Sequence, residues 1–195
     1  MDEVELVARA LKAWGDDPRR FVREAMGVTP EKWQDEVLAE IANGRRRIAV
    51  RSGHGVGKTA LEAWLVLWFG ITRVDAKIPA TAPTSHQLVD LLWGEVTKWH
   101  RALAERLPAI AHAIEIRADR IDFKPWRGTA YARTSRRDQP EALQGFHAEN
   151  LLFLIDEASV PPAMNSLSPW MVAAAPYRGE GRNCGLAYHC PSCPS

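Results

Sequence analysis

A glycine-rich loop between two apolar runs places the strongest constraint on this chain. The loop runs from Ser52 to Thr59 with the sequence SGHGVGKT, after a short β-branched run at 47–51 and before an apolar helical pattern at 60–69. Glycine forfeits side-chain burial and costs about 0.5–1 kcal/mol of backbone entropy inside a regular element. Three glycines at this place therefore indicate that the bare backbone is itself needed.

A loop of this kind between a strand and a helix is typical of phosphate binding. Backbone N–H groups point at phosphate oxygens, and the following helix adds the positive end of its dipole. We expect Lys58 to reach the β- and γ-phosphates and the Thr59 hydroxyl to bind Mg²⁺. The alternative is a flexible glycine turn that happens to end in Lys-Thr. The residues predicted to cradle the nucleotide are Ser52, Gly53, His54, Gly55, Val56, Gly57, Lys58 and Thr59.

Two carboxylates end a second apolar run, LLFLIDEAS, further along the chain. A continuous apolar run suits a strand that is buried on both faces of a parallel sheet. At its end, Asp156 would hold Mg²⁺ through the water shell of the ion, and Glu157 would orient and deprotonate the attacking water. A solvated acidic turn is the alternative interpretation of this pair.

Gln34 lies upstream of the loop and is a candidate for adenine recognition. A glutamine amide can pair with the N6 and N7 edges of adenine together, and Trp33 beside it is available to pack nearby. The alternative is that Gln34 lies on an exposed helix face.

Two further features are candidates for nucleic-acid contact. The stretch TAPTSHQ at 81–87 resembles a helicase motif whose loop touches the nucleic-acid backbone, but its residues 84–87 equally form a capping box that opens a helix. The arginines at 45–47, and Arg133, Arg136 and Arg137, are candidate phosphate contacts or plain solvated surface. The net charge of +1 excludes a strongly basic protein that encloses nucleic acid.

The order of the elements predicts an α/β fold. Helical spacing is found at 3–14, at 29–44 with Thr29 as N-cap and Gly44 after the end, at 60–69, and at 84–103, while strand patterns occupy 47–51, 77–82 and 151–155. The segments 114–123 and 128–135 alternate and suggest a small antiparallel pair. Alternating strands and helices predict a P-loop NTPase with a mostly parallel sheet flanked by helices. We expect this sheet to be incomplete after the strand that carries Asp156, which would leave an exposed edge and make the isolated chain poorly soluble.

Composition and charge support a globular, cytoplasmic protein. The 195 residues are 46% hydrophobic and 25% charged, and the longest apolar stretch is too short to cross a bilayer. The N-terminus is acidic where a secretory signal would be basic. We expect three regions: an N-terminal helical segment with Gln34 at 1–45, the P-loop core at 46–159, and an irregular tail rich in Pro and Cys at 160–195.

The tail has one constellation of its own. Cys184, His189, Cys190 and Cys193 are ligand types that suit tetrahedral zinc. Their crowding within ten residues leaves little backbone to wrap a metal, so an unstructured end and a disulfide stay open as alternatives.

In their order along residues 28–159, these motifs resemble the ATPase half of a phage terminase large subunit, the motor that pumps viral DNA into a capsid. The resemblance rests on Gln34, AVRSGHGVGKTALEAWLVLW, ATAPTSHQLVDLLWGEVTKWH and PEALQGFHAENLLFLIDEAS. It implies ATP and Mg²⁺ as cofactors, with the roles given above for Lys58, Thr59, Asp156 and Glu157. It further implies that Arg51 stabilises charge on the transferring phosphoryl group. One alternative is that Arg51 is only the end of a strand, and another is that Arg133 or Arg136 from a neighbouring copy has this role.

The same resemblance implies partners and a setting. Double-stranded DNA, other terminase subunits and the portal or prohead are the expected partners, in an oligomeric assembly without a membrane. The setting would be a phage or prophage protein in the cytoplasm of a bacterial host.

The chain departs from the family pattern after residue 159. The stretch WMVAAAPYRGEGRN has a short apolar run that ends in Ala-Ala-Pro-Tyr, without a coupling hydroxyl or amide at the place where the family has one, and no room remains for a nuclease domain. We therefore expect a fragment, with a frameshifted tail as one hypothesis and a genuine short variant as the other. The alternative functions are a helicase-like DNA-dependent P-loop ATPase and a non-catalytic nucleotide-binding remnant, and the chain is an ATPase if it is active.

Overall fold

A central sheet organises the molecule, in a computed structural model that describes residues 3–52, 55–82, 84, 87–134, 148–156, 170–176 and 185–187. The strands are β1 Arg47–Ser52, β2 Lys77–Ala82, β3 Ile114–Ile116, β4 Arg120–Phe123, β5 Gly128–Thr134, β6 Leu152–Ile155, β7 Trp170–Pro176 and β8 Gly185–Ala187. Their order in the sheet is β3-β4-β5-β2-β6-β7-β1-β8. The five strands from β5 to β1 run parallel. The predicted α/β fold with a mostly parallel sheet is confirmed.

Antiparallel strands extend both sides of this parallel centre. β4 pairs with β5, and β3 pairs with β4, so the two segments predicted to alternate do form antiparallel pairs. β8 pairs with β1 at the opposite edge.

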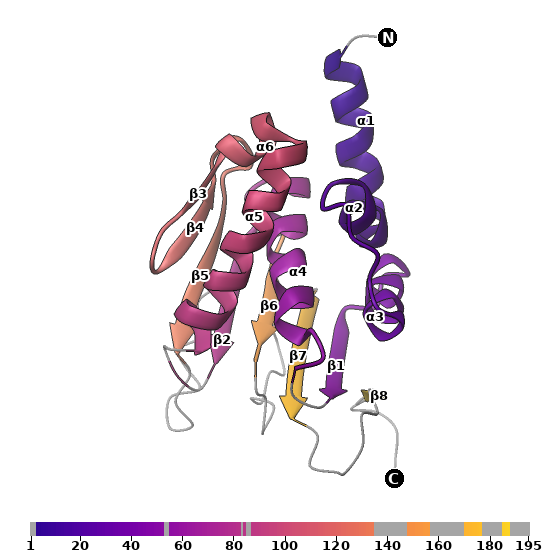
Figure 1. Cartoon of the computed structure of the whole chain (residues 1–195), viewed down its shortest axis with the longest axis vertical. Coiled ribbons are helices and arrows are strands. Elements are labelled where there is room, and N and C mark those ends of the chain that lie inside the picture. The colour runs from indigo at the N-terminus through magenta and orange to yellow at the C-terminus, as the bar shows by residue number, and fades with distance from the viewer. Residues whose placement is uncertain are drawn as a thin grey trace.

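Helices pack around α4 in front of the sheet (Figure 1). The helices are α1 Glu3–Asp16, α2 Pro18–Glu24, α3 Lys32–Ala42, α4 Lys58–Thr72, α5 Gly94–Arg106 and α6 Pro108–His112, with a π-helical turn η1 Gln87–Trp93 and a 3₁₀ turn η2 Lys124–Trp126. α4 contacts α1, α2 and α5 as well as β2 and β5. It is therefore the element that joins the helical layer to the sheet.

The sequence of α4 explains this central place. Every residue from Leu61 to Ile71 is buried, and a helix that is apolar all round belongs inside a protein. Trp64 and Trp68 lie one turn apart and are both buried. Trp64 packs edge-on against Trp99 of α5 with ring centroids 5.3 Å apart. These aromatic contacts fix α4 against its neighbouring helices.

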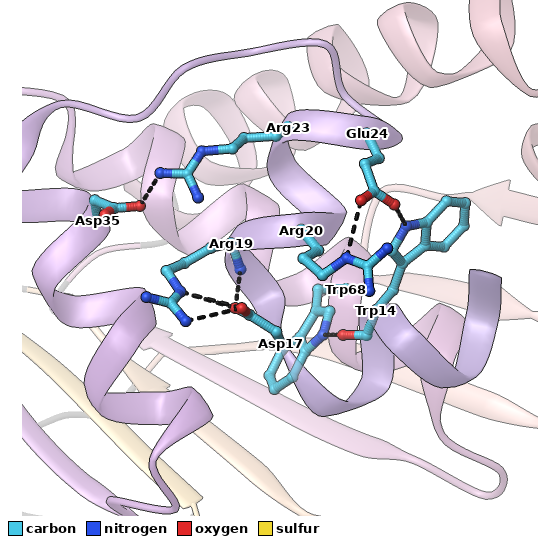
Figure 2. Close-up of polar contacts among 8 residues, drawn as sticks. All are labelled: Trp14, Asp17, Arg19, Arg20, Arg23, Glu24, Asp35 and Trp68. Carbon is cyan, nitrogen blue, oxygen red and sulfur yellow. Dashed lines mark hydrogen bonds and ion pairs between the residues drawn. The ribbon is translucent and has the colours of Figure 1, made fainter. Parts of the chain in front are cut away.

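Polar contacts join α1, α2 and α3 to each other and to α4 (Figure 2). The Trp14 indole donates to Glu24 Oε2 at 2.8 Å, and the Trp68 indole donates to the Trp14 carbonyl at 2.6 Å. Arg23 pairs with Asp35 between α2 and α3. The N-terminal helices are thus fastened to the helix that follows the glycine loop.

Two predicted helix starts differ from the structure. α3 begins at Lys32 with Glu31 as its N-cap rather than Thr29, because the Glu31 N–H donates to the Gln34 side-chain oxygen at 2.9 Å. Gly44 follows the helix with φ +84°, as expected for that position. The helix predicted over 84–103 is instead a π-helical turn followed by α5. Leu92, Val96 and Leu103, which have helical spacing, are buried.

The sheet does not stop at the strand that carries Asp156, and this corrects one expectation. β7 comes from the tail expected to be irregular, and it pairs parallel with β6 on one side and β1 on the other. β6 therefore has neighbours on both sides, so the edge expected to be exposed is covered. A central strand needs no alternation of polar and apolar residues, so the short apolar run WMVAAAP has no strand pattern of its own.

Among the described residues, none of the helices combines the length and the apolar character that crossing a bilayer requires.

Candidate nucleotide-binding site

The glycine loop connects β1 to α4 with a backbone that demands glycine. Gly55 and Gly57 have φ values of +72° and +89°, a region in which a side chain is strained. Gly57 is the N-cap of α4, so Lys58 and Thr59 lie in the first helical turn. A Cβ built on Gly55 would meet no atom within 4 Å. The loop thus presents open backbone next to the positive end of a helix dipole.

Gln34 reaches this loop from α3. Its Nε2 donates to the Gly57 carbonyl at 2.9 Å, while its Oε1 accepts from the Glu31 N–H at 2.9 Å. The side chain is buried, with 4% exposed, so the alternative of an exposed helix face is wrong. Both ends of the amide are engaged by the protein itself, and adenine recognition by Gln34 stays a prediction.

Asp156 leaves the sheet at the same edge as the glycine loop. It follows β6, and its N–H donates to the Thr81 carbonyl at 2.8 Å. β1 and β6 run parallel with only β7 between them, so Ser52 and Ile155 both end strands at the carboxyl edge. In open α/β sheets, ligands bind in the crevice at this edge.

Glu62 is a further candidate site residue, and sequence reasoning missed it. It lies on α4 one turn after Lys58, is 2% exposed, and has no hydrogen-bond partner for either carboxyl oxygen. Burial raises the pKa of Glu62 well above its ordinary value of 4.5, the negative charge of Asp156 raises it further, and Lys58 lowers it. Glu62 therefore lies within electrostatic reach of both Lys58 and Asp156, and this places these three residues in one neighbourhood.

Among the residues that the structure describes, few polar side chains are buried, and two of these belong to the loop's surroundings. Among the described residues, the buried polar or charged ones are Gln34, Glu62 and Thr81. Gln34 contacts the loop directly and Glu62 lies in the helix that follows it. The one available sequence signal was the acid at position 62 inside the apolar run ALEAWLVLWF.

Several predicted site residues fall beyond what the structure describes. Gly53, His54 and Glu157 lie outside the described residues, as do the cysteines and His189 of the tail. Arg51 and Ser52 are placed in β1 by their backbone, without a description of their side chains. The described part of the chain holds no group of three His, Cys, Asp or Glu residues that could bind a metal ion.

A curated phage protein is similar to this chain in sequence. No family model matches the chain. The probable terminase large subunit of Enterobacteria phage P7 is 28% identical over 136 residues, which is 68% of this chain and 27% of that protein. The chain thus spans a minor part of the length of this curated relative.

Solved structures agree with the sequence match. The large terminase ATPase domain of Thermus phage P74-26 has a TM-score of 0.56 at 21% identity, covering 82% of this chain and 69% of that one. The large terminase of bacteriophage HK97 has a TM-score of 0.60 at 12% identity, covering 83% and 37%. At these identities the structures show the fold. The chain therefore has the fold of phage large terminase ATPase domains, and the resemblance to phage terminase large subunits predicted from its motifs is confirmed.

Proposed function

We propose that this chain is the ATP-binding and ATP-hydrolysing motor domain of a phage DNA-packaging terminase large subunit. The observation that carries the proposal is the convergence of the glycine loop and Asp156 at one edge of the parallel sheet, with Lys58 and Asp156 both in electrostatic reach of Glu62. A phosphate cradle and a metal carboxylate at one crevice are the minimum that ATP·Mg²⁺ requires.

The loop fits a polyphosphate. Gly55 and Gly57 have positive φ values, and the space beside Gly55 is open. Val56 and the side chains of the first turn of α4, Lys58 and Thr59, are partly exposed. In the proposal, Ser52 to Thr59 wrap the phosphates and Lys58 neutralises the β- and γ-phosphoryl oxygens.

The donor set fits Mg²⁺. The Thr59 hydroxyl and the Asp156 carboxylate supply the oxygen ligands that Mg²⁺ prefers. When bound, Mg²⁺ would neutralise the charge that develops on the phosphoryl oxygens. Thr59 and Asp156 would hold it, and Lys58 would orient the terminal phosphate.

Three further roles complete the proposed reaction. Glu157, next in the chain after Asp156, would orient the attacking water and accept its proton. Arg51, at the end of β1, would stabilise the transferring phosphoryl group. Gln34, whose amide contacts the Gly57 carbonyl, would recognise the N6 and N7 edges of adenine.

Double-stranded DNA, other terminase subunits and the portal or prohead are the proposed partners, in an oligomeric motor of a phage or prophage protein in the bacterial cytoplasm. The support is the name of the relative from phage P7 and the shared fold. The chain would supply the ATPase part of that assembly.

A second candidate, a non-catalytic nucleotide-binding remnant, is favoured by one observation. β7 lies between β1 and β6 and ends Ala173-Ala174-Ala175-Pro176, next to the proposed site. These residues have no hydroxyl or amide side chain that could sense the phosphate and couple it to movement. A chain of this kind would bind ATP without turning it over.

ATP turnover, with and without added DNA, separates the two candidates. We expect wild type to hydrolyse ATP in the presence of Mg²⁺, and Lys58→Ala and Glu157→Gln to be inactive. Lys12→Ala, which removes an exposed lysine of α1, is the matched control and should keep wild-type turnover. If wild type binds ATP but hydrolyses no more of it than both site variants, the non-catalytic remnant is supported and the proposed motor function is contradicted.

A further inference from the structure

One acid in the core of α4 is not explained by packing. Glu62 is 2% exposed, and both of its carboxyl oxygens are buried without a hydrogen-bond partner. The helix around it, Leu61 and Ala63 to Ile71, is apolar and buried. A buried polar group without a partner is destabilising, and an apolar side chain of similar length would pack at position 62 without that cost. The presence of an acid at position 62 therefore indicates that its carboxyl interacts with a ligand or with another functional group.

The position of Glu62 directs it toward the proposed nucleotide site. It follows Lys58 by one helical turn, so the two side chains share a face of α4. Alternation along β6 puts Asp156 on the face of Leu152 and Leu154, which pack in the same core as α4. Glu62 thus faces the space between the helix that carries Lys58 and the strand that ends in Asp156.

The charges around Glu62 agree with this placement. The charged groups that act on its carboxyl are Asp156, from the end of β6, and Lys58, from its own helix. The carboxyl of Glu62 is buried, while Asp156 and Lys58 are partly exposed. A divalent cation bound beside Asp156 would be attracted by both acids. A cation beside Asp156 also favours the ionised form of Glu62.

We infer that Glu62 is a positioning residue of the nucleotide site, whose carboxyl acts with that of Asp156 to hold Mg²⁺ and with Lys58 to set the ammonium against the phosphates. This inference rests on the proposed function. Glu62 would act through the water shell of the ion rather than as a direct ligand, in the way that groups behind metal ligands tune a metal site.

Two substitutions distinguish this role from a purely structural one. Glu62→Gln keeps the shape and removes the acid, and Glu62→Met replaces it with an apolar chain of similar length. A structural role predicts that neither changes the Mg²⁺ dependence. The positioning role predicts that both raise the Mg²⁺ concentration needed for half-maximal binding of a fluorescent ATP analogue by about tenfold, while the melting temperature of Glu62→Met stays the same or rises. Glu105→Gln, at an exposed acid of α5, is the matched control and should show neither change.

The experiment uses the full chain, titrating Mg²⁺ at a fixed concentration of the ATP analogue and recording thermal melting of each variant in parallel. Raised Mg²⁺ midpoints for both Glu62 variants, with folded proteins, support the inference. If Glu62→Met does not fold, the midpoint of Glu62→Gln decides alone. Wild-type binding with unshifted midpoints in the Glu62 variants overturns the inference only, whereas wild type that binds no analogue at any Mg²⁺ concentration overturns the proposed function and this inference together.

Discussion

The side chain of Gln34 donates a hydrogen bond to the carbonyl of Gly57 at 2.9 Å, across 23 positions of the chain. Gly57 is the residue at which the glycine loop becomes α4. The start of α3 therefore braces the turn on which the proposed phosphate cradle depends, and the N-terminal helices are connected to the site through one amide.

Replacing Gln34 by Ala should destabilise the protein. The substitution removes two hydrogen bonds, one to the Gly57 carbonyl, which keeps its bond from the Leu61 N–H, and one from the Glu31 N–H. Each such bond contributes about 0.5–1.5 kcal/mol. Urea unfolding measures the change. Glu36→Gln, at an exposed position of the same helix, should stay at wild-type stability. A Gln34→Ala protein as stable as wild type would show that the brace contributes nothing.

Replacing Gly57 by Ala should cost more than replacing Gly55 by Ala. Both glycines have positive φ, so both substitutions introduce backbone strain of about 1–2 kcal/mol. Only at Gly57 would the new Cβ lie 2.8 Å from Gln34 Nε2, while at Gly55 the space is open. The comparison of the two variants by thermal melting isolates the clash. In the double variant Gln34→Ala with Gly57→Ala, part of the extra loss should disappear, and equal losses for the two single variants would contradict this account.

Gly70 is needed for the contact between α4 and the end of β4. A Cβ at position 70 would lie 2.3 Å from Phe123 Cζ, so Gly70→Ala overpacks the core and should cost about 1–3 kcal/mol or more. Gly94→Ala is the matched control, because a Cβ there meets nothing within 4 Å and alanine favours the first turn of α5. Denaturant unfolding of both variants tests the prediction. A Gly70→Ala variant that is no less stable than Gly94→Ala would be inconsistent with the packing described.

Burial of Glu62 predicts the direction in which the stability of the protein changes with pH. Its pKa is raised in the folded protein, so above its ordinary value of 4.5 the unfolded chain releases a proton that the folded chain retains. Stability is therefore lost as pH rises from about 4.5 toward the raised pKa. Glu62→Met removes this loss, so the stability of the variant relative to wild type should grow over that range. Other carboxyls, such as Glu24, whose pKa is lowered by the Trp14 indole, are common to both proteins and cancel. A difference that is constant with pH would contradict a buried, unpartnered Glu62.

Local signals explain which elements were predictable. The P-loop, α4 and β6 have their signatures within a few neighbouring residues: glycines before Lys58, an unbroken apolar helix, and an apolar run that ends in Asp156. α4 and β6 are found where these patterns predicted a helix and a strand, while phosphate binding by the loop stays a prediction.

Long-range pairing explains what was missed. β7 is a strand because β1 and β6 pair with it on either side. The residues WMVAAAP do not indicate this pairing. The bond from Gln34 to Gly57 likewise joins two helix ends that only the fold brings together. Glu62 was visible as an acid within an apolar helix, but its meaning depended on the position of Asp156, which follows a strand from much later in the chain.

Binding of a fluorescent ATP analogue as a function of Mg²⁺ concentration tests the central claim most directly, in wild type, Lys58→Ala and Asp156→Asn. Lys12→Ala serves as the control, since Lys12 is exposed on α1. If the glycine loop and Asp156 form one site, wild type binds in a Mg²⁺-dependent manner, Lys58→Ala loses about tenfold or more in affinity, and Asp156→Asn loses the Mg²⁺ dependence. If both site variants keep the affinity and the Mg²⁺ dependence of wild type, the claim that the glycine loop and Asp156 form one nucleotide site is contradicted.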